Sequence, residues 1–314
     1  MDEIWIVFII IATLCLLVLL VAFVCFYRTF YSRREKNEPE FPLPEEDIYK
    51  PFHAQMIAWQ KEMRTFPQEQ VEITSFDGLK LTGTYYEFAP NAPIELMFHG
   101  YRGSAIRDLC GGVQRCFRLG RSALIVNQRG SGTSEGKVIS FGINERKDCL
   151  SWVNFMLEKF GADVKIILTG ISMGASTVMM ASEFDLPKNV IGGVADCGYS
   201  SVEGIIKTTI REMGLPPKIV YPFIKLGARI FGKFNLDEAS PETALKNSKV
   251  PFVFVHGESD HIVPCEMCHV CYNACSASKL IHTIPNVGHG LAFPMDEDGY
   301  IKFLKDAEKI YKTF

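Results

Sequence analysis

Residues 165–183 read KIILTGISMGASTVMMASE and join a β-rich run to a helix-forming run. The junction, Gly170-Ile171-Ser172-Met173-Gly174, has the G-x-S-x-G pattern of a nucleophile elbow, a sharp strand-to-helix turn that exposes a serine hydroxyl. Both glycines are expected there, because a Cβ at either position would collide with neighbouring backbone in such a turn. The five-residue pattern alone occurs often by chance. Its place between a strand and a helix makes Ser172 the candidate nucleophile.

The residues around this junction alternate between short β-rich runs and longer helical runs, which is typical of a largely parallel sheet covered by helices. Asp77-Gly78 is a hairpin turn signal, so the first two strands are expected to be antiparallel. With 314 residues, 47% of them apolar, the chain can form one large domain with appendages. The predicted fold is α/β, with a mostly parallel central sheet and helices on both faces. Strands are expected at residues 71–75, 79–86, 94–99, 123–127, 165–171, 190–195, 252–256 and 280–284.

A serine hydroxyl is a poor nucleophile at neutral pH and needs a base, for which imidazole has a suitable pKa. Among seven histidines, His289 stands in Asn286-Val287-Gly288-His289-Gly290, a loop directly after the last predicted strand. Its flanking glycines let the loop approach the serine closely, so His289 is the candidate base. His99 and His256 close predicted strands, and His53, His261, His269 and His282 have no comparable loop context.

An acidic residue is needed to fix the tautomer of the base and to stabilise the imidazolium. Asp260 fits this role, because the loop Gly257-Glu258-Ser259-Asp260-His261 follows a predicted buried strand. Asp196 also ends a strand and could reach the same histidine, so it stays open as the alternative acid. With Asp260 as the acid, the three residues occur in the chain order Ser, Asp, His.

Acyl transfer also requires hydrogen-bond donors aimed at the developing oxyanion. The backbone N–H of Met173, directly after the serine, is one candidate donor. The second is the backbone N–H of Tyr101, in the turn His99-Gly100-Tyr101-Arg102-Gly103 after a predicted strand. These two amides form the predicted oxyanion hole.

From about residue 70 to residue 314 the chain resembles the α/β-hydrolase superfamily. The likeness rests on the His99-Gly100 turn, the elbow, the loop 256–260 and the loop Gly288-His289-Gly290, in the superfamily's order. The run Asn127 to Ser134 also resembles a stretch after the fourth strand, although Asn127 stands where aspartate is common. The branch that the chain resembles most is that of serine-aminopeptidase and monoacylglycerol-lipase-like hydrolases, whose activities are mixed.

The resemblance and the candidate residues together predict a serine hydrolase that cleaves small-molecule carboxylic esters through an acyl-enzyme and needs no cofactor. Lipid-like or acyl esters are favoured over short soluble esters because of the apolar insertion and the N-terminal segment described next. A peptidase or thioesterase on the same three residues is the first alternative. The second is a non-catalytic, membrane-tethered interaction protein on a hydrolase scaffold. A net charge of −3 argues against nucleic acid as a partner.

The N-terminal segment from Ile4 to Tyr27 holds 24 residues without a charge. As a helix it is roughly 36 Å long, enough to span a membrane with some tilt. A cleavable signal peptide is the rival interpretation, but it would have a basic start and a shorter apolar stretch. Basic residues follow the span at Arg28, Arg33, Arg34 and Lys36, so the positive-inside rule predicts a cytoplasmic catalytic domain on a single-pass cell-membrane protein.

Two further segments flank or interrupt the domain. Residues 4–27 form the anchor, residues 28–66 are expected to form a proline-containing stalk with a short helix at 52–66, and the hydrolase domain is expected to span 67–314. The region of about residues 199–245 interrupts the strand–helix rhythm and is expected to form a helical lid. Lys218, Lys225 and Arg229 recur there at helical spacing, as a solvated face or as a contact for anionic lipid.

Cys265, Cys268, Cys271 and Cys275 have the spacing C-x2-C-x2-C-x3-C of an iron–sulfur cysteine run. The segment follows the loop that carries the predicted acid, where this fold places a helix. On a helix Cys265 would sit apart from the other three, whereas a cluster needs four converging thiolates. The sequence therefore predicts thiols on a helix and no metal site.

Overall fold

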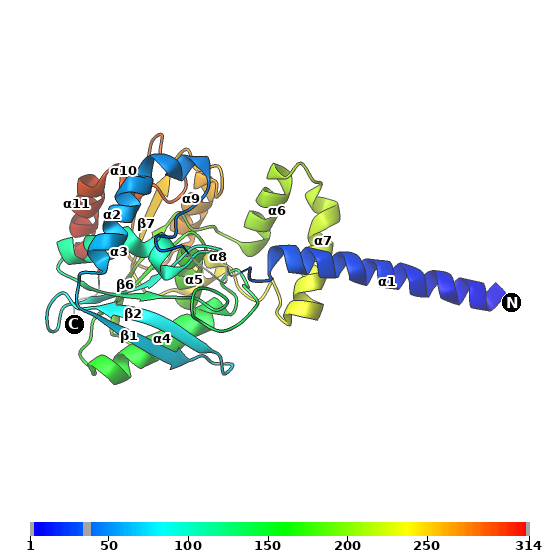
Figure 1. Cartoon of the computed structure of the whole chain (residues 1–314), viewed down its shortest axis with the longest axis horizontal. Coiled ribbons are helices and arrows are strands. Elements are labelled where there is room, and N and C mark those ends of the chain that lie inside the picture. Colours follow the sequence, from blue (N-terminus) through cyan, green and yellow to red (C-terminus); the bar gives the residue numbers. More distant parts are fainter. Residues whose placement is uncertain (1–2, 34–38, 312–314) are drawn as a thin grey trace.

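The computed structural model describes residues 3–33 and 39–311, and a mixed α/β domain carries a long N-terminal helix that projects from one end (Figure 1). The strands are β1 (Gln68–Thr74), β2 (Lys80–Tyr86), β3 (Ile94–Phe98), β4 (Ser122–Val126), β5 (Ile166–Ile171), β6 (Val190–Asp196), β7 (Phe252–Gly257) and β8 (Lys279–Ile284). The α-helices are α1 (Glu3–Thr29), α2 (His53–Met63), α3 (Ala105–Arg118), α4 (Glu145–Phe160), α5 (Met173–Ala181), α6 (Val202–Glu212), α7 (Pro217–Gly227), α8 (Pro241–Asn247), α9 (Cys265–Ala274), α10 (Ala292–Met295) and α11 (Glu297–Ala307). Three short helices complete the chain: η1 (Asp47–Phe52), the π-helical turn η2 (Ala228–Gly232) and η3 (Glu308–Ile310).

The eight strands form one sheet in the order β1-β2-β4-β3-β5-β6-β7-β8. β1 pairs with β2, and β2 with β4, in antiparallel fashion, and the remaining neighbours are parallel. The hairpin turn at Asp77-Gly78 closes as the sequence predicts, with Gly78 at φ +88° and the Ser75 N–H donating to the Leu79 carbonyl over 2.8 Å. Because β3 and β5 are parallel neighbours, the loops that follow them meet at one edge of the sheet.

Helices cover both faces of the sheet, as predicted. Side chains alternate along each strand, so Leu96 and Phe98 of β3 pack in one core with Trp152 of α4, while Met97 packs in another with Val113 of α3. Helices α4, α5 and α9 contribute to the first core, and α2, α3, α10 and α11 lie against the other face. The sheet is therefore buried on both sides, which fixes the positions of the loops at its edge.

The end of α1 is part of the domain rather than the start of a free stalk. Phe30 is fully buried and packs edge-on against Phe141 and Phe234, with ring centroids 5.8 and 5.1 Å away. The backbone after it pairs with residues 137–139: the Ser32 N–H donates to Lys137 over 2.9 Å, and the Ile139 N–H donates to Phe30 over 2.8 Å. Arg34 and Lys36, part of the predicted basic cluster, lie outside the described residues.

Residues 39–66 also differ from the expected stalk, because most of them pack on the domain. The short helix occurs as α2, and its buried Met56, Trp59 and Met63 face the domain. The side-chain amide of Gln60 donates to the Pro42 carbonyl over 2.8 Å and fastens the proline-containing segment to this helix. The apolar face of α2 is buried against α3, so this helix is part of the domain and not of a separate stalk.

Candidate active site

Ser172 occupies the sharp turn between β5 and α5, as the elbow pattern predicts. Its backbone has φ 55° and ψ −119°, a strained conformation for a residue with a side chain. A Cβ added to Gly170 would lie 2.2 Å from the backbone of Gly174, and one added to Gly174 would lie 2.0 Å from the Phe98 carbonyl oxygen. The two glycines are thus required by close backbone contacts on both sides of the serine.

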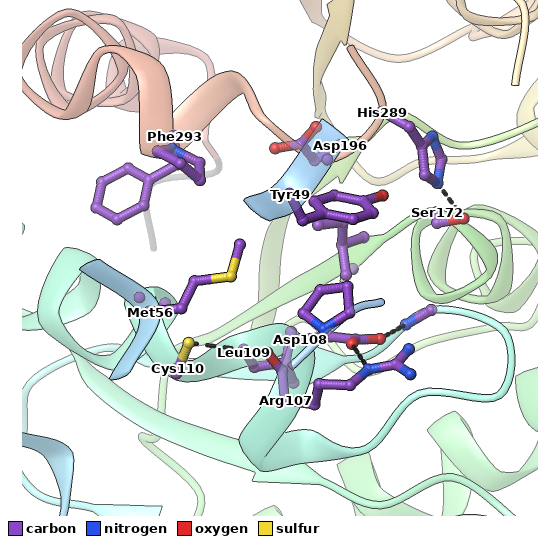
Figure 2. Close-up of a pocket in the computed structure, with 18 of the residues that line it drawn as sticks. Tyr49, Met56, Arg107, Asp108, Leu109, Cys110, Ser172, Asp196, His289 and Phe293 are labelled. Carbon is purple, nitrogen blue, oxygen red and sulfur yellow. Dashed lines mark hydrogen bonds and ion pairs between the residues drawn. The ribbon is translucent and has the colours of Figure 1, made fainter. Parts of the chain in front are cut away.

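Ser172, His289 and Asp260 lie in one chain of hydrogen bonds (Figure 2 shows the first of them). The Nε2 atom of His289 is 2.9 Å from the Ser172 hydroxyl oxygen, and its Nδ1 atom is 2.6 Å from Oδ2 of Asp260. The histidine comes from the loop after β8 and the aspartate from the loop after β7. The fold thus brings together three residues that the sequence separates by up to 117 positions.

The surroundings of Asp260 keep its carboxylate charged and oriented. Its Oδ1 atom accepts hydrogen bonds from the backbone N–H groups of Ile262, over 2.9 Å, and Val263, over 2.8 Å. Its Oδ2 atom also lies 3.2 Å from Nε2 of His256. Burial by itself would raise the pKa of Asp260, but the hydrogen bonds from His256 and His289 hold that pKa well below its usual range.

Asp196, the alternative acid, has a different environment. Its Oδ2 atom accepts a hydrogen bond from the Tyr300 hydroxyl over 2.9 Å, and burial raises the pKa of the carboxyl group. Its backbone carbonyl accepts the Ser172 N–H over 2.8 Å, so it supports the elbow through the main chain. The geometry pairs His289 with Asp260, not with Asp196.

The predicted oxyanion loop lies beside the serine. A Cβ added to Gly100 would be 3.6 Å from the Ser172 Cβ. The Gly100 N–H donates to the Asp108 carboxylate over 3.0 Å, and this hydrogen bond holds the turn in place. Met173 begins α5, where the first N–H groups have no acceptor within the helix. The loop also contacts the end of α1, which sequence reasoning missed: the Tyr101 hydroxyl donates to the Thr29 carbonyl over 2.5 Å.

A cavity of about 250 Å³ opens beside Ser172. Figure 2 shows Ser172 and His289 at one end of it and Met56 and Phe293 at the other, with the ring of Tyr49 extending toward the serine. Residues 44–59 contribute one side of this cavity. The sequence does not predict this, because it indicates a stalk over most of that segment. The apolar spacing of α2 was the available signal. Of the described residues that line the cavity, none belongs to the expected lid at 199–245.

Three potential metal ligands meet at the same place. Cys197, Asp260 and His289 offer ligand atoms within 4.8 Å of one another. The two ring nitrogens of His289 are already hydrogen-bonded, Nε2 to Ser172 and Nδ1 to Asp260. Burial raises the pKa of the Cys197 thiol well above its usual range. A metal ion would have to break these contacts and ionise the thiol, so this donor set fits the hydrogen-bonded arrangement better than a metal centre.

The cysteine run begins in a helix, as predicted. Cys265, Cys268 and Cys271 lie on α9, and Cys275 follows its end. Cys268, Cys271 and Cys275 pack in the core to which α4, α5 and α9 contribute. Cys265 lies outside that core. Burial raises the pKa of each of these thiols. Their side chains therefore serve as small apolar groups.

No family model matches the chain. An uncharacterized protein of Bacillus subtilis, YqkD, is 24% identical over 189 residues, which are 60% of this chain and 62% of that protein. An uncharacterized membrane protein of Saccharomyces cerevisiae is 26% identical over 191 residues, or 60% of this chain and 61% of that protein. The chain thus covers less than two thirds of the length of these two relatives. Protein bem46 of Schizosaccharomyces pombe is 24% identical over 246 residues, or 76% of this chain and 75% of that protein.

Solved structures share the arrangement of the domain. An esterase of Pyrococcus furiosus has a TM-score of 0.65 at 19% identity, covering 80% of this chain and 94% of that one. Est1E of Butyrivibrio proteoclasticus, solved with bound ferulic acid, has a TM-score of 0.57 at 18% identity, covering 75% of this chain and 98% of that one. The sheet order, the helices on both of its faces and these likenesses show that the chain has the α/β-hydrolase fold.

Proposed function

We propose that the chain is a serine hydrolase that cleaves carboxylic esters, with Ser172, His289 and Asp260 as its catalytic residues. The observation that carries this proposal is the continuous chain of hydrogen bonds from Ser172 through His289 to Asp260. The esterases among the structural neighbours support the same reaction class. The mechanism needs no cofactor, because serine, imidazole and carboxylate supply the nucleophile, the base and the orienting charge.

In the first half of the reaction, Ser172 attacks the ester carbonyl while Nε2 of His289 takes the hydroxyl proton. The Nδ1–H of His289 donates to Asp260, which fixes the tautomer and stabilises the imidazolium that forms. The backbone N–H groups of Met173 and Tyr101 bind the developing oxyanion. His289 then returns the proton to the leaving alcohol. Water, activated by the same histidine, releases the acid from the acyl-enzyme.

The substrates we propose are acyl esters, including lipid-like ones. Met56 and Phe293 lie at the end of the cavity away from Ser172, and Trp59 stacks on Phe293 with ring centroids 5.4 Å apart; these side chains suit an apolar acyl or alkyl group. Acyl esters of graded chain length, assayed with and without lipid vesicles, test this choice. A steady fall in kcat/KM from acetyl to octanoyl esters would rule out lipid-like esters as the preferred substrates.

We further propose that α1 anchors the protein in the cell membrane with the domain on the cytoplasmic side. The helix spans 27 residues with mean hydropathy 3.4 in its apolar window, and most of its side chains are exposed. The burial of Phe30 supports an anchor over a cleaved signal, since cleavage nearby would remove part of the domain's packing. Arg28 and Arg33 follow the span and support the orientation. Protease added to intact cells should leave the domain uncut; cleavage from outside contradicts the orientation.

Replacing the nucleophile tests the reaction itself. Ser172→Ala should lower kcat on a p-nitrophenyl ester by about 10⁴-fold or more. Ser151→Ala, on the surface-facing side of α4, is the matched control and should keep full activity. A folded wild-type protein that turns over no ester in the panel would instead favour a non-catalytic interaction protein.

A further inference from the structure

The insertion between β6 and β7 carries an apolar surface that the domain leaves uncovered. Its exposed apolar side chains include three large aliphatic groups that are 43% to 63% exposed. We call this surface the insertion patch; it consists of Met213, Leu215, Ile219, Pro222 and Ile230. Met213 and Leu215 lie in the turn between α6 and α7, Ile219 and Pro222 on α7, and Ile230 on η2. Exposed large apolar side chains gathered on neighbouring elements are a mark of an interaction surface.

Cations flank the insertion patch. Lys218, Arg229 and Lys233 are exposed and make no ion pair within residues 3–33 and 39–311. Lys225, which the sequence placed on the same face, is paired with Asp237 and does not share this property. An exposed apolar surface bordered by unpaired cations matches the composition of helices that lie in a membrane interface.

The insertion is also fixed at a defined depth beside the anchor. Helices α1 and α7 are in contact, and Figure 1 shows α7 crossing α1 at the end nearest the domain. A Cβ on Gly227 would lie 2.4 Å from the Ala22 carbonyl oxygen, and the Phe231 ring packs on Phe23 and Phe26 with centroids 5.2 and 5.9 Å away. These contacts all fall on residues 22–26 of the anchor.

That level coincides with the membrane boundary. About 20 residues of a helix cross the hydrocarbon core, so a span that starts at Ile4 leaves the core near Phe23. Tyr27 and Arg28 come four and five residues later, and such residues are typical of the interfacial layer. Because α7 and η2 contact residues 22–26 and cross the anchor, they lie where head groups meet acyl chains.

We propose that the insertion patch lies in the interfacial layer of the bilayer that α1 enters, with its aliphatic side chains at the acyl boundary and Lys218 and Arg229 at anionic head groups. This inference rests on the proposed anchoring and is independent of the proposed hydrolysis. A bilayer is the occupant because α7 and η2, which carry part of the patch, pack on the anchor, and because unpaired cations accompany the apolar groups. A second attachment point beside the span would fix the tilt of the domain against the membrane.

Site-specific fluorescence on the full chain tests this arrangement. Ile219→Cys and Ile230→Cys variants, with Cys15 and Cys25 replaced by alanine, are labelled with an NBD dye and placed in nanodiscs of phosphatidylcholine and phosphatidylserine. Phe88→Cys, in the loop after β2, is the matched control because Phe88 is 46% exposed and Ile230 is 43% exposed. Leu17→Cys, within the span, reports whether the anchor has inserted.

We expect blue-shifted emission at positions 219 and 230, and at least twofold quenching when the nanodiscs contain lipids with a doxyl group near the head of the acyl chain. Position 88 should keep solvent-like emission. If position 17 is quenched while 219 and 230 behave like 88, the anchoring stands and the inference is overturned. If position 17 is not quenched either, the anchoring itself fails. A blue shift at 219 without lipid quenching would mean that a protein covers the patch, which also overturns the bilayer assignment.

Discussion

Exchanging each candidate acid for asparagine gives a sharp prediction, because the structure dictates how the new amide must sit. In Asp260→Asn the oxygen of the amide has to remain where Oδ1 accepts two backbone N–H groups, from Ile262 and Val263. The NH₂ group must then face Nδ1 of His289, now 2.6 Å from Oδ2. A donor at that position forces the proton of the imidazole onto Nε2. The base can then no longer accept the proton of Ser172.

The expected loss in kcat is about 10⁴-fold, or about 5 kcal/mol at 1.36 kcal/mol per tenfold change. Asp196→Asn should cost less than about tenfold, because an amide oxygen can still accept the Tyr300 hydroxyl and the elbow contact is made by the backbone. Steady-state hydrolysis of a p-nitrophenyl ester measures both values, and circular dichroism verifies folding. A loss above 10³-fold in Asp196→Asn, with Asp260→Asn within tenfold of wild type, would refute the assignment.

Three other substitutions test the packing. Phe30→Ala should destabilise the domain by about 3–5 kcal/mol, seen as a lower Tm in detergent, whereas Phe8→Ala in the exposed part of the anchor should leave the Tm unchanged. Gly174→Ala should abolish activity or folding, because its Cβ would lie 2.0 Å from the Phe98 carbonyl oxygen; a fully active variant contradicts the elbow geometry. Glu95→Gln should cost about 3–5 kcal/mol at neutral pH, since it leaves the buried Arg115 without a carboxylate partner and Arg121 with Glu308 alone, and denaturant unfolding at several pH values measures that cost.

The pH dependence of the Glu95 effect has a definite sign. Burial would raise the pKa of Glu95, but Arg115 and Arg121 lower it from 4.5 to about 2. A group whose pKa is depressed by folding stabilises the native state above its unfolded value and loses that effect as the pH falls through its folded value. The difference between wild type and Glu95→Gln should therefore shrink between pH 4.5 and pH 2. A difference that stays constant across this range would contradict the ion-pair account.

The parts of the candidate site whose positions in the fold the sequence indicates are those with a strong local signal. Close backbone contacts on either side of Ser172 exclude any side chain at Gly170 and Gly174. The G-x-S-x-G pattern is therefore recognisable from five consecutive residues. The loops that carry Asp260 and His289 follow strands whose apolar runs stand out. The strand–turn–helix context of the elbow then indicates that these two loops lie at the same edge of the sheet as Ser172.

The features that sequence reasoning missed depend on contacts between distant segments. Nothing local in residues 28–33 indicates that Phe30 is buried under Phe141 and Phe234, because that contact exists only after the domain has folded. The prolines between residues 39 and 44 suggested a stalk, yet Gln60 holds Pro42 against the domain and Tyr49 reaches the cavity. The sequence indicates a lid over the site, but α7 packs on α1.

The most direct test of the central claim is covalent labelling of the folded full-length protein with a fluorophosphonate, followed by mapping of the adduct by peptide mass spectrometry. An activated serine reacts with this probe because its proton passes to the neighbouring histidine. We predict a single adduct on Ser172, absent in Ser172→Ala and strongly slowed in Asp260→Asn. A folded wild-type protein that remains unlabelled at Ser172, or is labelled at another serine, would contradict the account.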